Sequence, residues 1–97
     1  MPSVFEVIAD PGRRRLLHLL QDGPAAVGDL VKAIGMSQPN TSRHLGVLRE
    51  AGLVTSRTAG RRHVYELRIE GFTELARWLT PYVVLRQRAL DAAPPRR

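Results

Sequence analysis

The stretch SQPNTSRHLGVLREAGLV, residues 37–54, starts with a serine that can cap a helix and passes a glycine that can end one. At about 100° per residue, one side of that helix gathers Thr41, His44, Leu45, Leu48 and Ala51. The opposite side gathers Gln38, Pro39, Ser42, Arg43 and Gly46, flanked by Asn40. The pattern predicts a helix that is anchored by leucines and presents short hydrogen-bonding groups outward. Such a helix fits the DNA major groove, where Arg suits guanine and Asn or Gln suits adenine.

The sequence before this helix predicts three more helices. VGDLVKAI, residues 27–34, is amphipathic and is followed by Gly35, so that only two residues separate it from Ser37. A connection of this length is typical of a helix-turn-helix. Upstream, Asp10 can cap a helix with Pro11 at its first position, and residues 3–8 predict a shorter amphipathic helix.

After Gly52 the hydrophobic period changes from helical to alternating. Residues 53–57 (LVTSR) and 62–67 (RHVYEL) are β-branched, aromatic and roughly alternating, and TAGR between them contains a turn glycine. These residues predict a two-stranded β-hairpin with a basic tip. A helix-turn-helix followed by such a hairpin is the winged-helix order, in which the tip can reach the DNA backbone or minor groove.

The C-terminal third returns to a helical pattern from about residue 71. Thr80-Pro81 falls in its middle, so the sequence leaves open one kinked helix or two helices with Thr80 as a new cap. We expect a single α+β winged helix-turn-helix domain over residues 1–97, with core and wing in 3–67. Residues 71–92 would be an additional dimerisation helix, and 93–97 a frayed tail.

Charge is unevenly distributed along the 97 residues. The net charge is +6, and residues 37–63 alone carry five arginines against the single acidic residue Glu50. A cationic segment of this kind favours an anionic polymer as partner, although a merely solvated basic face is the plain alternative.

Composition excludes several classes of function. The chain has no cysteine, which excludes disulfides, thiol catalysis and cysteine-ligated zinc. It has no signal-peptide pattern and no apolar run near the ~18 residues of a membrane span. We therefore expect a soluble cytoplasmic protein, associated with the nucleoid and without a membrane partner.

The remaining polar residues suggest neither a metal site nor an active site. His18, His44 and His63 fall on three different predicted elements, with no carboxylate at ligand spacing. Ser42 and His44 are two residues apart on one helix and so point apart, which does not suit a nucleophile and its base. We predict no catalytic residue, no cofactor and no metal.

Three motifs together resemble the signature regions of ArsR-type bacterial winged-helix repressors. They are ADPGRRRLLHLL, SQPNTSRHLGVLREAGLV and GRRHVYEL, and they match in order and spacing over about residues 5–67. The resemblance implies a homodimeric repressor that uses the Ser37 helix for bases and the wing for the backbone. It also implies that the first and last helices form the dimer interface.

The sequence departs from the metal-sensing members of that family. Many of them carry a cysteine pair in the helix before the recognition helix, where this chain has Ala26 and Gly28. Others bind zinc through Asp and His on the last helix, and no histidine follows His63 here. We therefore expect a repressor that does not respond to metal.

Two sets of residues are predicted to carry the function. Those expected to contact double-stranded DNA are mostly short polar or cationic: Ser37, Gln38, Pro39, Asn40, Ser42, Arg43, His44, Arg57, Arg61 and Arg62. Those expected at the dimer interface are apolar: Val4, Phe5, Ile8, Phe72, Leu75, Trp78, Leu79, Tyr82, Leu85 and Leu90. A two-fold dimer would read a palindromic operator.

Two alternatives stay open at this point. One is a winged helix that serves as a protein-interaction module, with a basic face that is only solvated. The other keeps the DNA-binding function but adds a non-metal effector or partner protein that releases the repressor.

Overall fold

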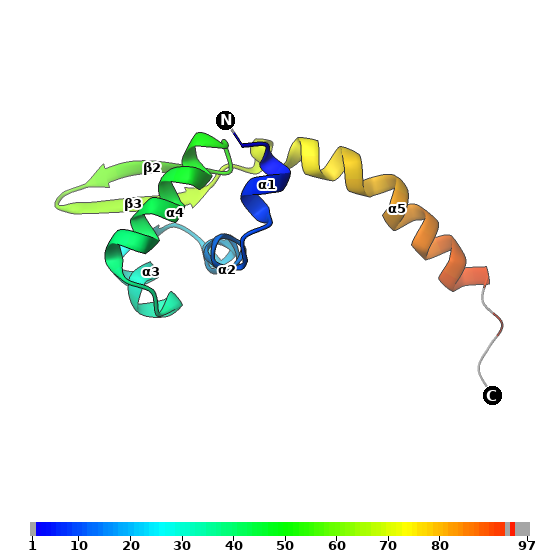
Figure 1. The fold of residues 1–97 in the computed structure, drawn as a ribbon, viewed down its shortest axis with the longest axis horizontal. Coiled ribbons are helices and arrows are strands. Elements are labelled where there is room, and N and C mark those ends of the chain that lie inside the picture. The colour runs from blue at the N-terminus through cyan, green and yellow to red at the C-terminus, as the bar shows by residue number, and fades with distance from the viewer. Residues whose placement is uncertain (1, 93, 95–97) are drawn as a thin grey trace.

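The computed structural model describes residues 2–92 and 94 of the chain. Its helices are α1 (Val4–Ile8), α2 (Pro11–Leu19), α3 (Val27–Ile34), α4 (Gln38–Glu50) and α5 (Thr73–Ala92), with short 3-10 turns at Leu20–Asp22 and Ile69–Phe72. The strands are β1 (Ala25–Ala26), β2 (Val54–Ala59) and β3 (Arg62–Leu67). Helices α1 to α4 and the sheet form one body, from which α5 and the β2–β3 hairpin extend in opposite directions (Figure 1).

Each of the first helices starts where its cap predicts. Ser3 accepts from the N–H of Glu6 while the Glu6 carboxylate accepts from the N–H of Ser3, which forms a complete capping box on α1. The Asp10 carboxylate caps α2 by accepting from the N–H of Arg13 at 2.9 Å. Helix α3 ends at Gly35, whose φ of 72° lies in the left-handed region that glycine adopts without strain. The turn between α3 and α4 is therefore as short as the sequence predicts.

The sheet has one more strand than the sequence predicts. Its order is β1-β3-β2, and all of its pairings are antiparallel. The hairpin pairs Val54 with Leu67 at its base and Ala59 with Arg62 at its tip, so a two-residue turn connects the strands. The predicted two-stranded hairpin is confirmed, and the additional strand β1 was not predicted because it has only two residues, both alanine, and so carries no alternation.

The core lies between α1, α2, α3, α4 and the base of the hairpin. Its buried apolar residues are Val4, Val7, Leu16, Leu17, Leu20, Ala26, Leu30, Ile34, Leu45, Leu48, Leu53 and Val54. Leu45 and Leu48 of α4 are completely buried, and truncation of such a leucine to alanine costs about 2–5 kcal/mol. The leucine side predicted for α4 is thus the side that fixes this helix to the body.

The C-terminal segment is one helix rather than two. Helix α5 runs continuously from Thr73 to Ala92 with Pro81 inside it. The Thr80 hydroxyl donates to the carbonyl of Ala76 at 2.6 Å, so Thr80 bonds back into the helix instead of starting a new one. The predicted tail 93–97 lies outside the described residues, except for Pro94.

Candidate nucleic-acid interface

Helix α4 is held at its N-terminus by its own side chains. The Ser37 hydroxyl accepts from the N–H of Asn40 at 3.2 Å, and the Thr41 hydroxyl donates to the carbonyl of Ser37 at 2.9 Å. Pro39 lies in the first turn, where its missing N–H costs no hydrogen bond. These contacts fix the first turn, which is the part of the helix predicted to meet DNA.

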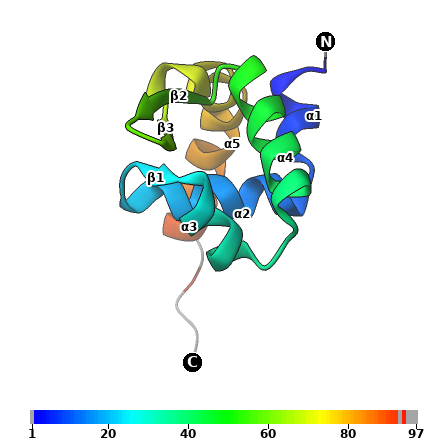
Figure 2. The same cartoon turned by 90° about the vertical axis from the view of Figure 1, so that its left-hand side faces the viewer.

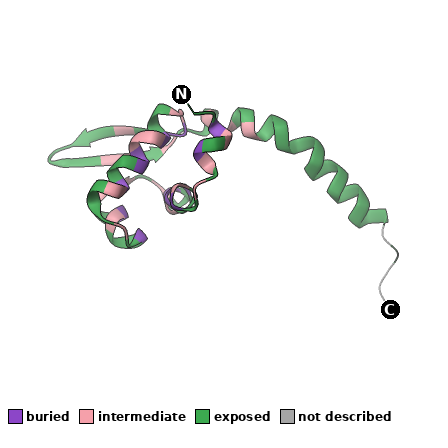
Figure 3. Ribbon diagram, viewed as in Figure 1, coloured by how far each residue is buried: buried purple, intermediate pink, exposed green. Residues whose placement is uncertain are grey.

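The two faces of α4 are separated as the helical wheel predicts. Thr41, His44, Leu45 and Leu48 are buried, whereas Ser37, Gln38, Pro39, Ser42 and Arg43 are exposed. The same division is visible along the α4 ribbon (Figure 3). The exposed face of the first two turns therefore presents short polar groups and Arg43, and the packing of the core does not use them.

Arg43 and Asn40 form a pair on the exposed side of α4. Nη2 of Arg43 donates to Oδ1 of Asn40 at 2.6 Å, and the two residues are three positions apart. The bond orients the amide and the guanidinium relative to each other before any ligand binds. Both groups are of the kind that recognises purine edges in the major groove.

A hollow of about 580 Å³ lies between the exposed face of α4, the start of α3 and strand β3. It is lined by Ala26, Val27, Gly28, Asp29, Lys32, Gln38, Ser42, Arg49, Arg61, Arg62, His63 and Tyr65. We call it the basic groove. Figure 2, viewed from the hairpin end, shows the β2–β3 hairpin and α4 on opposite sides of the molecule's near face.

The basic groove contains two cations that the sequence did not single out. Arg49 lies seven residues after Ser42, which is two helical turns on the same face, so extending the helical wheel would have found it. Its Nη1 lies 3.4 Å from the hydroxyl of Ser56 on β2. Lys32 comes from α3, and no sequence pattern places it beside α4.

The arginines of the wing do not all have the same surroundings. Arg57, Arg61 and Arg62 are all exposed, and Arg61 lies in the turn at the hairpin tip. Arg62 is engaged within the chain, because its Nη2 donates to Oδ2 of Asp29 at 2.6 Å. The structure thus brings Arg61 and Arg62 to one groove with Gln38 and Ser42, and gives Arg62 an acidic neighbour.

His44 is among the predicted DNA contacts although the helical wheel places it on the leucine side, and it lies in the interior. It is 6% exposed, and its Nδ1 lies 3.4 Å from Nη1 of Arg13. Since a guanidinium can only donate, Nδ1 accepts, and the ring proton is on Nε2, which lies 4.0 Å from Oδ2 of Asp10. Arg13 also donates through Nε to the carbonyl of Val7 at 2.6 Å. His44 therefore connects α4 to α2 and, through Arg13, to α1.

Burial and neighbouring charges shift both titratable groups of this cluster. Burial lowers the pKa of His44, Asp10 opposes this, and the guanidinium groups of Arg43 and Arg13 lower it further. The backbone N–H of Arg13 lowers the pKa of Asp10. The arrangement favours a neutral imidazole beside an ionised carboxylate.

Six of the ten residues predicted for the dimer interface line a second, apolar hollow. It measures about 500 Å³ and lies between α1, α2 and the first turns of α5, with Phe5, Ile8, Phe72, Leu75, Trp78 and Leu79 among its lining. The Phe5 and Trp78 rings meet edge to face at 5.9 Å between centroids. Val4 is different, because it is 8% exposed and belongs to the core of its own chain.

Beyond this hollow, α5 exposes a large apolar surface. Trp78, Leu79, Tyr82, Val83, Val84, Leu85 and Leu90 are between 42% and 57% exposed. The Trp78 and Tyr82 rings lie 5.1 Å apart between centroids. No residue of α5 is buried, so the helix does not fold back over its own core.

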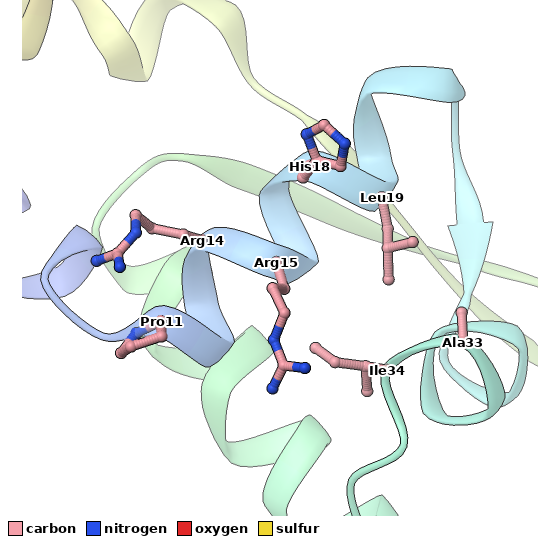
Figure 4. A pocket seen from close by; sticks show the side chains of 7 residues that line it. All are labelled: Pro11, Arg14, Arg15, His18, Leu19, Ala33 and Ile34. Carbon is pink, nitrogen blue, oxygen red and sulfur yellow. The ribbon is translucent and has the colours of Figure 1, made fainter.

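A third hollow, of about 470 Å³, lies between α2 and the end of α3 (Figure 4). It is lined by Pro11, Arg14, Arg15, His18, Leu19, Ala33 and Ile34. Nη1 of Arg14 donates to the carbonyls of Ile8 and Ala9 at 2.8 and 2.9 Å, so this side chain covers the end of α1. None of the seven lining residues is among the predicted DNA or dimer contacts.

The histidines do not assemble a metal site in the part of the chain that the structure describes. His18 is exposed on α2, His44 is buried under α4 and His63 is exposed on β3. Across residues 2–92 and 94, no three His, Asp or Glu side chains lie together as a ligand group. Over the same residues, no helix is long and apolar enough to span a membrane.

Comparison with known proteins agrees with this geometry. Residues 10–56 match the model of the family described as bacterial regulatory protein, arsR family. The transcriptional repressor SdpR of Bacillus subtilis is 30% identical over 83 residues, which cover 86% of this chain and 92% of that protein. All of the matched family segment lies between the cap of α2 and the first half of β2.

Two solved structures are similar over nearly the whole chain. The crystal structure of a possible transcriptional regulator for arsenical resistance has a TM-score of 0.79 and 36% identity, over 97% of this chain and 100% of that one. The solution structure of the homodimeric winged helix-turn-helix DNA-binding domain Mb0332 from Mycobacterium bovis has a TM-score of 0.68 and 29% identity. That match covers 97% of this chain and 84% of the other.

Proposed function

The chain belongs to the arsR family of bacterial regulatory proteins, and we propose that it is a homodimeric repressor that binds double-stranded DNA by sequence. Its relatives are named as transcriptional regulators and repressors, and it is not an enzyme. A repressor of this kind would work in the cytoplasm, on the DNA of the nucleoid.

One observation carries the proposal: Gln38 and Ser42 of the exposed face of α4 line the same basic groove as Arg61 and Arg62 of the hairpin. An α-helix of this kind fits the major groove, while a basic hairpin beside it can follow the backbone. Lys32 and Arg49 add two more cations to the same surface. A basic face that is only solvated would not require α4 and the wing to line the same groove.

The residues predicted to contact DNA, of which Gln38, Ser42, Arg61 and Arg62 line the basic groove, would divide between two kinds of contact. Gln38, Asn40, Ser42 and Arg43 would reach base edges, and Pro39 would pack beside them against the backbone. The N–H groups at the start of α4, with Arg57 and Arg61, would bind phosphates on any sequence, and Arg62 would do so in the operator complex. His44 would support α4 from beneath, because a buried imidazole cannot touch DNA.

Dimerisation would follow from the apolar surface of α5. A monomer rarely exposes a contiguous apolar surface of this extent, and a two-fold axis would cover it with its own copy. The Mb0332 domain is described as homodimeric, which supports the same arrangement here. Two α4 helices one DNA turn apart, at roughly 34–36 Å, would then read a palindromic operator.

Binding to duplex DNA at several salt concentrations tests the proposal. Selection from a random-sequence duplex pool should enrich a palindrome, and the affinity for it should fall linearly on a log–log plot against salt. A winged helix used as a protein-interaction module would bind no duplex tightly and would enrich no sequence.

We further propose that the repressor does not respond to metal. The chain has no cysteine, and Ala26 and Gly28 supply no ligand atoms. Zinc, cadmium or arsenite at stoichiometric concentration should therefore leave the affinity for the selected operator unchanged. Release of the DNA by any of the three ions would contradict this part of the proposal.

A further inference from the structure

The basic groove contains a carboxylate. Asp29 lines it together with Lys32, Arg49, Arg61 and Arg62, and no other acidic side chain is among the residues that line it. Oδ2 of Asp29 accepts from Nη2 of Arg62 at 2.6 Å, and the two side chains are 63% and 61% exposed. An acidic group at this position would face the phosphates of an approaching duplex.

The backbone places these two residues together. Strand β1 pairs with β3 through Ala26 and Val64, and β1 runs directly into α3. The first turn of α3, which contains Asp29, therefore lies beside the part of β3 that leads to the hairpin tip. A carboxylate in a first turn is also stabilised by the helix dipole. The ion pair thus follows from the β1–β3 register and not only from two long side chains meeting in solvent.

We propose that Asp29 is an internal counterion that engages Arg62 in the DNA-free protein and thereby weakens binding to nonspecific DNA. This inference rests on the proposed function. An arginine that is free in solution binds a phosphate and releases a condensed cation from the DNA, which drives binding. Arg62 is already neutralised, so moving it to a phosphate leaves Asp29 unpaired beside the duplex. Arg62 then contributes little to a nonspecific complex, where no base contacts repay the exchange.

The size of the effect is set by the exposure of the pair. Exposed ion pairs of this kind are weak, so replacing Asp29 should tighten nonspecific binding by up to about fivefold. The salt dependence is a more direct readout, because each phosphate contact adds about 0.9 to the slope of log K against log salt. A freed Arg62 should add one such contact.

The experiment compares four proteins: the parent chain, Asp29→Asn, Arg62→Ala and the double variant. Their affinities for a short mixed-sequence duplex are measured by fluorescence anisotropy over a series of salt concentrations. We expect Asp29→Asn to steepen the slope by about 0.9, and Arg62→Ala to leave the parent slope nearly unchanged. The double variant should return to the parent slope, so that Arg62 matters only when Asp29 is absent.

Glu74→Gln is the matched control, because it removes the same charge from an exposed residue of α5 that does not line the basic groove. It should keep the parent slope. Two results would overturn the inference while leaving the proposed function intact. One is that Arg62→Ala makes the slope of log K against log salt shallower by the same amount in the parent chain and in the Asp29→Asn variant. The other is that Asp29→Asn weakens binding. Absence of duplex binding by all of the proteins at low salt would overturn both.

Discussion

At the scale of single residues, His44 has a different role from the one its sequence position suggests. It lies in the half of α4 that carries the polar groups, yet its ring is directed into the core and meets Arg13 and Asp10. Residues of the same helix turn can differ this much because a rotation of about 100° separates neighbours. Arg43, the preceding residue, is exposed and bonds to Asn40 instead.

The buried imidazole should make the stability of the fold depend on pH. Its pKa is lowered in the folded state, so the unfolded chain binds more protons as the pH falls below its ordinary value of about 6.5. The contribution is complete above that pH and is lost as the pH falls toward the lowered pKa. The melting temperature, measured at one protein concentration, should therefore fall between pH 7 and 5. His44→Leu should flatten this segment and cost about 1–3 kcal/mol at pH 7, since it leaves the Arg13 donor without its acceptor.

Asp10 should also make the stability of the fold depend on pH, but at lower pH than His44 does. Its pKa is also lowered, so its contribution is lost only as the pH falls below about 3.8, in a window distinct from that of His44. Asp10→Asn should alter the acid limb of the melting curve and keep the decline that starts near pH 6, which should extend to lower pH because Asp10 no longer opposes the lowering of the His44 pKa. A parent protein whose melting temperature is constant from pH 7 to 5 would contradict the role assigned to His44.

Arg43 should contribute to base recognition. If it grips a guanine, Arg43→Ala should cost about 1–3 kcal/mol on the selected operator and relax the preference at one position in each half-site. Arg15→Ala removes an exposed arginine outside the basic groove and is the matched control. Equal losses on operator and mixed-sequence DNA would assign Arg43 to the backbone instead.

At the scale of elements, the register of the β2–β3 hairpin determines where its arginines lie. Its six-residue register places Arg61 in the two-residue turn, where Gly60 has a φ of 62°. That left-handed conformation suits glycine and fixes the tip that carries the arginine. Arg57 lies on β2, pairs with Val64 and is also exposed.

Arg61→Ala should weaken binding to all DNA sequences alike. A phosphate contact carries no base information, so the selected operator and mixed-sequence DNA should lose similar affinity, with a slope shallower by about 1. Arg57→Ala should behave in the same way. Because Arg62 is paired with Asp29, replacing both tip arginines should cost about one contact rather than two on mixed-sequence DNA. A slope unchanged by Arg61→Ala would mean that the wing does not reach the DNA.

At the scale of the whole molecule, the chain is more extended than its length predicts. The radius of gyration is 16.9 Å, against about 12.5 Å for a globular chain of this size. The excess comes from α5 and the hairpin, which leave the body at opposite ends (Figure 1). An extended helix with this much apolar surface suggests that the stable particle contains two chains.

The faces of α5 allow a paired test of the dimer. At about 100° per residue, Leu85 falls on the stripe of Trp78 and Tyr82, whereas Val84 falls on the opposite side, apart from the other exposed apolar residues of α5 and outside the surface that a partner would cover. Leu85→Glu should give a monomeric mass by light scattering at micromolar concentration, with weaker binding to a palindrome. Val84→Glu should remain dimeric. A dimer that survives Leu85→Glu would place the interface elsewhere, and a monomeric parent would exclude it.

Local signals in the sequence determined the helices, their caps, the two faces of α4 and the hairpin. Capping residues, turn glycines and hydrophobic periods act over a few positions, so Ser37, Gly35 and the leucines of α4 specify their own surroundings. The tertiary structure decided what these elements meet. It alone paired β1 with β3, brought Lys32 and Asp29 to the basic groove, buried His44 against Arg13, and directed α5 away from the core. Those contacts join residues far apart in the chain, and no local propensity encodes them.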